Sequence, residues 1–279
     1  MFEKDKFIYL DPSMEILISC IDFTIENFII DKKSPIKVIK ENAFKDCFLL
    51  KNVTIDKKDL YIEKKAFPDD TIKTLTIGDG LIDKNAINVK QLQKITFLKG
   101  VVNQKLFLDF PTPRSKARNL EEINVIPNDK EETDFSVDGV WYKKNEDNPL
   151  PTLMFYPPGK KDKFFEVIKV KNINDIAFRS NPYLETIALP KIYYMEEFYT
   201  SFISCKNLKQ ILIPVISHEV FLEKYDCPNL TTIYTDCVHS VNDYMKEEYE
   251  IAPSHYFREE SIKKAKSFKE INKVYKSFR

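Results

Sequence analysis

The sequence predicts a mainly β solenoid with few helices, for three reasons. A short pattern of apolar residues recurs about seven times between residues 36 and 236. Inside each copy two apolar residues stand two positions apart, which is the spacing of side chains on one face of a β-strand. Phenylalanine (21 residues) and tyrosine (14 residues) are abundant, and aromatic rings fill the core of stacked coils well.

The expected strands align on one central apolar residue in each copy. These anchors are Val53, Leu75, Ile95, Ile123, Ile187, Ile211 and Ile233, with gaps of 22, 20, 28, 64, 24 and 22 residues. A period in the low twenties is typical of leucine-rich repeats, which belong to the right-handed β/α superhelix class. A second inward apolar residue follows two positions after every anchor except the last, where Thr235 stands.

Two further positions recur upstream of each anchor. A Leu or Ile stands three residues before it, as at Leu50, Ile72 and Leu184, and an Ala-Phe pair comes earlier, as at Ala43-Phe44 and Ala177-Phe178. A single repeat of this kind cannot bury its apolar edge alone, so neighbouring repeats must stack and share one core. The pattern therefore predicts a solenoid in which the Phe side chains fill the spine.

Changes in composition divide the chain into five expected parts. These are cap strands at 1–34, repeats one to four at 35–125, a β-hairpin island at 126–172, repeats five to seven at 173–237, and a helical cap or tail at 238–279. The hairpin is expected from FSVDGVWYKK and TLMFYPP, joined by KNEDNPLP. Asp138-Gly139 fits either a tight turn or a bulge.

The C-terminal part is expected to contain an amphipathic helix. From Ser261 onward, apolar residues recur every three or four positions, at Ile262, Ala265, Phe268 and Ile271. Residues 258–279 also hold eight Lys or Arg against three Glu. Two interpretations are open: the helix caps the last repeat, or its basic face contacts an anionic membrane or a partner.

The cysteines are expected to be structural. Cys47, Cys205 and Cys227 each stand three residues before a repeat leucine, and Asn181 holds the same place in its own repeat. In such turns Cys or Asn can bond to loop backbone, and free cysteine is commonly buried. Cys20 and Cys237 remain, and a bond between opposite ends of a solenoid is implausible. A zinc site built from Cys227, Cys237, His218 and His239 lacks the close ligand pairs of known zinc motifs.

No catalytic motif is found, so the sequence predicts a protein without catalytic residues, metal or cofactor. A G-x-S-x-G elbow, a phosphate-binding loop and a dinucleotide-binding glycine pattern are all absent. The 43 acidic and 43 basic residues balance, which argues against a nucleic-acid partner. The first 15 residues carry acidic side chains and no apolar segment of signal-peptide length, and no stretch is long and apolar enough to span a membrane.

Residues 38–55, VIKENAFKDCFLLKNVTI, and residues 176–190 carry a family resemblance. Their pattern of Ala-Phe, then Cys or Asn, then Leu before the strand resembles the BspA-type leucine-rich repeats of bacterial surface proteins. FSVDGVWYKK and LMFYPPGK also resemble an island found in that family. The resemblance covers about 35–236 and implies adhesion or protein interaction at the cell surface, with a host or matrix protein as partner.

The candidate binding site is the outward row of the expected main sheet. Side chains next to the anchors point away from the core, and they are Thr54, Thr76, Thr96, Asn124, Ala188, Leu212 and Tyr234. Exposed Thr suits a strand for structural reasons alone, whereas Leu212 and Tyr234 in such a row indicate a contact patch. We therefore expect a non-catalytic, monomeric, protein-binding repeat protein. The alternatives are a membrane-associated scaffold that uses 258–279 and, more remotely, an enzyme of unrecognised type.

Overall fold

The computed structural model divides into two units, residues Met1–Gly139 and Val140–Arg279, each of which is described by itself. It describes residues 1–78, 86–100, 102–104, 117–127, 133–189, 202, 204–212 and 227–231, and the backbone alone of 108–109, 114–115, 213, 232–235 and 262–264. Within these residues the secondary structure is β, and no α-helix occurs. Each unit is a β-solenoid of stacked coils, so the predicted mainly β solenoid is confirmed and the β/α superhelix class is not.

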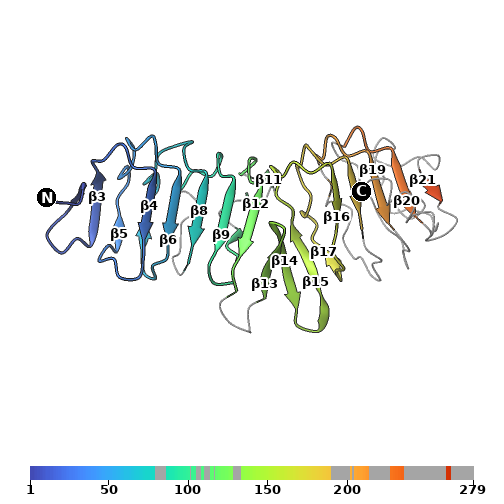
Figure 1. Ribbon diagram of the computed structural model, residues 1–279, viewed down its shortest axis with the longest axis horizontal. Helices are drawn as coiled ribbons and strands as arrows, with labels where there is room; N and C mark the ends of the chain where they lie inside the picture. The colour runs from blue at the N-terminus through green and yellow to red at the C-terminus, as the bar shows by residue number, and fades with distance from the viewer. Residues whose placement is uncertain are drawn as a thin grey trace, which may run out of the picture. The chain divides into compact units, whose positions relative to one another are not determined.

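The main sheet of the first unit has five parallel strands (Figure 1). Its order is β12 (Glu122–Val125), β9 (Lys94–Phe97), β8 (Thr74–Ile77), β6 (Asn52–Ile55) and β4 (Asn27–Ile30). The anchors Val53, Leu75, Ile95 and Ile123 stand opposite one another in this register and are buried. The predicted strand positions are confirmed here. β4 is an additional strand, in the segment expected to hold cap strands.

A second sheet of the first unit lies earlier in each coil. It contains β1 (Phe2–Lys4), β2 (Phe7–Tyr9), β3 (Ile16–Cys20), β5 (Val38–Ile39) and β7 (Tyr61–Ile62), in that order. β3, β5 and β7 are parallel, whereas β1 and β2 form an antiparallel hairpin on β3. The unit also holds the short antiparallel pair β10 (Leu108–Asp109) and β11 (Arg114–Ser115), and β13 (Asp134–Val137).

Phenylalanine rings form the core of the first unit, as the Ala-Phe pattern predicts. Phe44 and Phe67 stack with ring centroids 4.9 Å apart, and Phe28 lies 4.5 Å from Phe44. Phe7 of the N-terminal hairpin contacts both Phe28 and Phe44 at 6.0 and 6.2 Å. These rings come from successive coils, so each coil is fixed by its neighbours.

The second unit contains another five-stranded parallel sheet and the predicted hairpin. The sheet order is β16 (Phe164–Glu166), β18 (Thr186–Ala188), β19 (Gln210–Ile213), β20 (Thr232–Thr235) and β21 (Ile262–Lys264). The hairpin consists of β14 (Val140–Asn145) and β15 (Asn148–Phe155), and β15 also pairs in parallel with β17 (Asn172–Ile173). Its pairing reaches Asn145 and Asn148, so its turn is shorter than the expected KNEDNPLP connection.

The alternatives left open at Asp138-Gly139 are resolved. Asp138 and Gly139 have φ angles of 50° and 75°, and positive φ at both central residues is the geometry of a two-residue type I′ turn. Trp141 and Tyr142, the next aromatic residues on β14, are buried.

The C-terminal helix is not confirmed. Residues 262–264, which were expected to begin it, form strand β21, with Ile262 opposite Ile233 and Lys264 opposite Thr235. An unpaired edge of β20 would expose a row of backbone groups, and pairing with β21 satisfies them, which outweighs a local helical pattern. The remaining residues of 238–279 lie outside the described part of the chain, so their capping or membrane role stays a prediction.

Candidate functional site

The outward row of the first unit exists as the sequence predicts. Thr54, Thr76, Thr96 and Asn124 stand opposite one another on β6, β8, β9 and β12. Their side chains are half-buried, whereas the residues on either side of them in each strand are buried, because successive side chains of a strand leave opposite faces. The array thus presents short polar side chains at the regular spacing of neighbouring strands.

A second row runs parallel to the first, two residues earlier in each strand. It consists of Asn27, Asn52, Thr74, Lys94 and Glu122. Asn52 donates its Nδ2–H to Asn27 Oδ1 at 2.7 Å, and Thr74 donates its hydroxyl to Asn52 Oδ1. Together with Thr54, Thr76, Thr96, Asn124 and Ile29 on β4, these residues form what we call the polar face.

The polar face ends in a charged pair at β9 and β12. Lys94 Nζ lies 3.0 Å from Glu122 Oε2, and Asn124 Nδ2 donates to Glu122 Oε1 at 2.9 Å. Both charged side chains are about two-fifths exposed, so this ion pair contributes little to stability. Its effect is to present one cation and one anion at fixed places on an otherwise neutral surface.

Sequence reasoning missed the contribution of β4 to this face. Asn27 and Ile29 extend the two rows by one strand, and Ile29 is 70% exposed where the other coils of the row have Thr or Asn. The signal is present in the sequence. Residues 27–30 read NFII and residues 52–55 read NVTI, so both segments have an apolar residue at the second and fourth positions.

In the second unit the row is present in register but is not exposed. Ala188 stands opposite Leu212, and Leu212 opposite Tyr234, yet Ala188 is 2% and Leu212 1% exposed. The expectation that Leu212 is exposed in a contact patch is therefore wrong, and Ala188, another residue of the predicted row, is not exposed either. Thr186 is buried too, so β18 is covered on both faces. Strands of a sheet that is covered on both faces carry apolar residues at successive positions and not only at alternate ones. The side chain of Tyr234 lies outside the described residues.

The cysteines bond to the backbone of the preceding coil. Cys205 donates its thiol to the Phe178 carbonyl at 2.9 Å, and Cys227 donates to the Phe202 carbonyl at 2.7 Å. All four described cysteines are buried and free. Burial raises the pKa of Cys47 to about 12 and keeps that of Cys205 well above the ordinary value. These thiols are therefore structural, as predicted, and poorly suited to nucleophilic chemistry.

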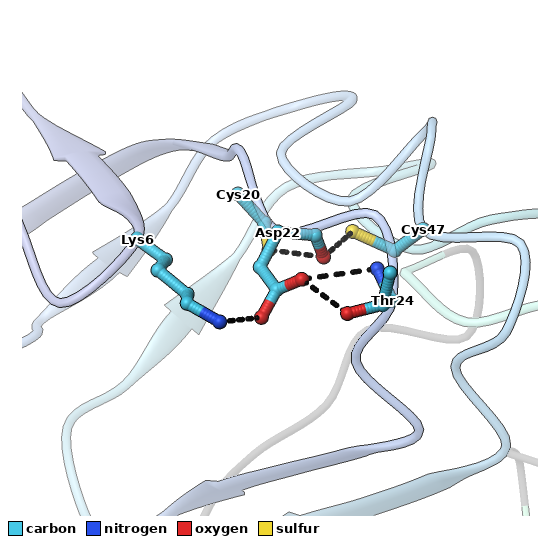
Figure 2. A network of polar contacts seen from close by, with 5 residues as sticks. All are labelled: Lys6, Cys20, Asp22, Thr24 and Cys47. Atoms are coloured by element: carbon cyan, nitrogen blue, oxygen red, sulfur yellow. Dashed lines mark hydrogen bonds and ion pairs between the residues drawn. The ribbon is translucent and has the colours of Figure 1, made fainter.

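The first coil has an aspartate in the same turn position (Figure 2). Since Phe28 pairs with Val53, Asp22 aligns with Cys47. The Asp22 carboxylate accepts hydrogen bonds from Lys6 Nζ at 2.7 Å, Thr24 Oγ1 at 2.6 Å and Thr24 N at 3.1 Å. Cys20 and Cys47 donate to the Asp22 carbonyl oxygen at 3.5 and 3.7 Å. The hydrogen bonds from Lys6 and Thr24 lower the pKa of Asp22 to about 2.

Replacing Asp22 with alanine is expected to lower the thermal midpoint in a pH-dependent way. A carboxylate whose folded pKa is depressed stabilises the fold above its unfolded pKa, and this contribution is lost as the pH falls through the folded value. The difference between wild type and Asp22→Ala should therefore be constant from pH 7 to 5 and shrink between about pH 4 and 2. Thermal unfolding followed by circular dichroism tests this, with the exposed Asp46→Ala as control. A difference that does not change with pH would contradict it.

The described residues offer no metal centre. No group of three or more His, Cys, Asp or Glu side chains is placed there to hold a metal ion. Of the four residues considered for a zinc site, Cys227 is engaged with the Phe202 carbonyl, while His218, Cys237 and His239 lie outside the description. Across the same described ranges, we find no helix long and apolar enough to cross a membrane.

Comparisons with known proteins support the repeat assignment. The model of the BspA type leucine rich repeat region matches residues 20–111 and 165–249, in six copies. No curated protein sequence matches the chain. Among solved structures, the chain is similar to a leucine rich cell surface protein from Faecalibacterium prausnitzii, at 15% identity over 86% of this chain and 96% of that one, with a TM-score of 0.32.

Two other solved structures show a similar degree of likeness. The pneumococcal vaccine antigen PcpA is 15% identical over 91% of this chain and 65% of its own, with a TM-score of 0.34. A leucine-rich repeat protein from Eubacterium ventriosum is 17% identical over 78% of this chain and 80% of its own, with a TM-score of 0.31. At such identities the likeness concerns the fold alone.

Proposed function

The chain belongs to the BspA-type leucine-rich repeat family, and from this premise we propose that it is a non-catalytic protein that binds another protein, as an adhesion protein does, through the polar face of its first unit. Repeat solenoids commonly bind partners on an extended sheet face, where side chains from successive coils lie at a fixed spacing. The partner that we propose is a host or matrix protein, as the family resemblance implies.

One observation carries the proposal: five strands place ten outward side chains in two straight rows above a buried core. Hydrogen bonds between Asn27, Asn52 and Thr74 hold one row in place before any partner arrives. A preorganised surface loses little conformational entropy on binding, so even modest contacts contribute to affinity. Lys94 and Glu122 would set the orientation of a partner with complementary charges.

The proposal is tested by placing bulky charges in the middle of the polar face. The triple substitution Thr54→Arg, Thr76→Arg and Thr96→Arg should weaken binding to the partner by at least about a hundredfold, because it buries several unpaired charges at the contact. The binding measurement is surface plasmon resonance against fractionated extracellular-matrix proteins. Binding that survives these changes would show that the partner docks elsewhere.

A matched control separates the effect of changing the polar face from the effect of raising the net charge. Glu3→Gln, Glu41→Gln and Asp46→Asn raise the net charge by the same three units at exposed positions away from the polar face. This control should bind like the wild type. Circular dichroism spectra and unfolding midpoints of both triple variants should stay near those of the wild type, since half-exposed strand positions tolerate substitution.

A further inference from the structure

The edge of the main sheet of the first unit at β4 is open. Lys51 and Asn52 donate their backbone N–H groups to the Glu26 carbonyl, and Asp56 donates to the Ile30 carbonyl. Because backbone groups of a strand alternate in direction, Glu26, Phe28 and Ile30 face β6, and Asn27 and Ile29 face away from it. Within the described residues, the N–H and C=O groups of Asn27 and Ile29 have no hydrogen-bond partner.

At the corresponding end of the second sheet, β3 pairs with β2, and β2 with β1. The antiparallel hairpin thus covers the edge of β3, and β1 is the terminal strand of that sheet. Phe7 of this hairpin also covers the end of the core, because its ring contacts Phe28 and Phe44. The open backbone groups of β4 therefore lie beside a core whose end is covered by the Phe7 ring.

The side chains at the open edge extend the order of the polar face. Thr74 donates a hydrogen bond to Asn52, and Asn52 donates one to Asn27, so each residue donates to its neighbour on the side of β4. Asn27 accepts with Oδ1, and its own Nδ2 donor has no hydrogen-bond partner within the described residues. Beside it, Ile29 is 70% exposed, and an apolar neighbour on a further strand would cover it.

We propose that the β4 edge is a docking site for an extended segment of a partner protein, which adds a sixth, parallel strand. The segment has a short polar acceptor (Asn, Asp, Ser or Thr) level with Asn27 and a β-branched apolar residue level with Ile29. Strand addition of this kind takes affinity from main-chain hydrogen bonds and specificity from alternate side chains. It is distinct from docking on the polar face, because it uses the edge of the sheet.

A second copy of the chain fits this edge less well. Two β4 strands related by a two-fold axis run antiparallel, and the register that pairs all four free backbone groups places Asn27 opposite Ile29 of the other copy. That arrangement leaves the Asn27 amide donor against an aliphatic side chain. A parallel strand of another sequence matches polar with polar and apolar with apolar. The strand is also short and flanked by Glu26 and Asp31, which disfavours unspecific edge pairing.

The first test uses a peptide taken from the natural neighbour of β4. The probe is residues 51–58 of this chain, KNVTIDKK, with Thr54→Ile, so that Asn comes level with Asn27 and Ile with Ile29. In a parallel addition its Val and second Ile donate to β4, while its Asn and first Ile point away. Methylating the backbone nitrogens of Val and the second Ile should abolish binding. Methylating those of Asn and the first Ile should leave the dissociation constant within about threefold of that of the unmethylated peptide.

The second test alters the protein at the edge. Ile29→Pro removes an outward N–H that bonds to nothing in β6, and proline is tolerated on edge strands with that side facing solvent. This variant should bind the peptide at least about tenfold more weakly, whereas Ile29→Thr, which keeps the backbone groups and loses only one apolar side-chain contact, should lose much less affinity. Amide hydrogen exchange should show that the peptide slows exchange at Asn27 and Ile29 in the wild type.

Three results would overturn the proposal. These are no binding of the peptide at millimolar concentration, equal binding of the two methylated peptides, and a dimer in sedimentation that Ile29→Pro converts to a monomer. The last result would assign the edge to a second copy. If Ile29→Pro unfolds, the two methylated peptides on the wild-type protein still decide the question. The Arg substitutions on the polar face leave the β4 backbone unchanged, so failure of the proposed function is measured separately.

Discussion

Asn181→Ala is expected to destabilise the second unit by about 3–5 kcal/mol, because several buried backbone groups lose their partner together. Asn181 is fully buried, and its Nδ2 lies 3.2–3.3 Å from the carbonyl oxygens of Pro157, Pro158 and Lys160. Its Oδ1 accepts from the backbone N–H groups of Tyr183 and Leu184 at 2.8 and 2.9 Å. Alanine leaves these groups unpaired in a place that water does not reach freely.

Asn181→Cys provides the matched control, because cysteine occupies the same turn position at Cys205 and Cys227. One thiol can donate to one carbonyl of the preceding coil, as those two cysteines do. Cysteine at 181 should therefore recover part of the loss, leaving a destabilisation of about 1–2 kcal/mol. Stability should fall in the order wild type, Cys variant, Ala variant, because these side chains bond to progressively fewer backbone groups.

The single tryptophan makes this measurement specific to the second unit. Trp141 is the only Trp in the chain and is buried in β14, so its fluorescence reports unfolding of that unit. Urea titrations followed by Trp fluorescence give the free energy of unfolding for the wild type and both variants. Equal stability of the Ala and Cys variants would show that the turn is held by packing alone.

The strands and their register could be predicted because they rest on a short-range rule. Alternation of apolar and polar residues fixes which side chains of β6, β8 and β9 are buried, and repetition at about 22 residues fixes which strands are neighbours. The turn position of Cys47, Cys205 and Asn181 was found in the same way. In each case the sequence itself contains the repeated signal.

A second series of asparagines was missed although its signal is also local. Asn119, Asn207 and Asn229 each precede the repeat leucine directly, as RNL, KNL and PNL. Each donates its Nδ2–H to a carbonyl of the preceding coil, namely Lys90 at 3.0 Å, Pro182 at 2.6 Å and Lys206 at 2.8 Å. Aligning the copies on the leucine would have revealed the recurring asparagine, whose bond the structure then shows.

The burial of Leu212 and the strand β21 could not be predicted, because both depend on what packs against a strand. Alternation shows that Leu212 faces away from Ile211, but it does not say whether another segment covers that face. Likewise the apolar pattern after Ser261 fits a helix, and pairing of Ile262–Lys264 with β20 is a long-range event. The exposed Ile29 was missed because β4 lies before the first aligned anchor, Val53, in the segment assigned to cap strands.

Phe44→Ala is expected to destabilise the first unit by about 3–5 kcal/mol, the usual cost of removing a buried phenylalanine. The Phe44 side chain is fully buried, stacks on Phe67 of the next coil with ring centroids 4.9 Å apart, and contacts Phe28 of the preceding coil at 4.5 Å. Alanine would open a cavity between three coils. Because a solenoid is held mainly by the interfaces between adjacent coils, this loss affects the cooperative unfolding of the whole unit.

Phe48→Ala is the matched control for this prediction, since it removes the same ring from the same turn. Phe48 is 69% exposed, four residues after Phe44, and its loss should change the unfolding free energy by less than about 0.5 kcal/mol. Urea unfolding followed by circular dichroism measures both variants. Trp141 fluorescence monitors the second unit in the same samples and should shift less than the dichroism signal for Phe44→Ala. Similar costs for the two phenylalanines would mean that the stacked rings do not stabilise the solenoid, because burial against adjacent coils is the difference between them.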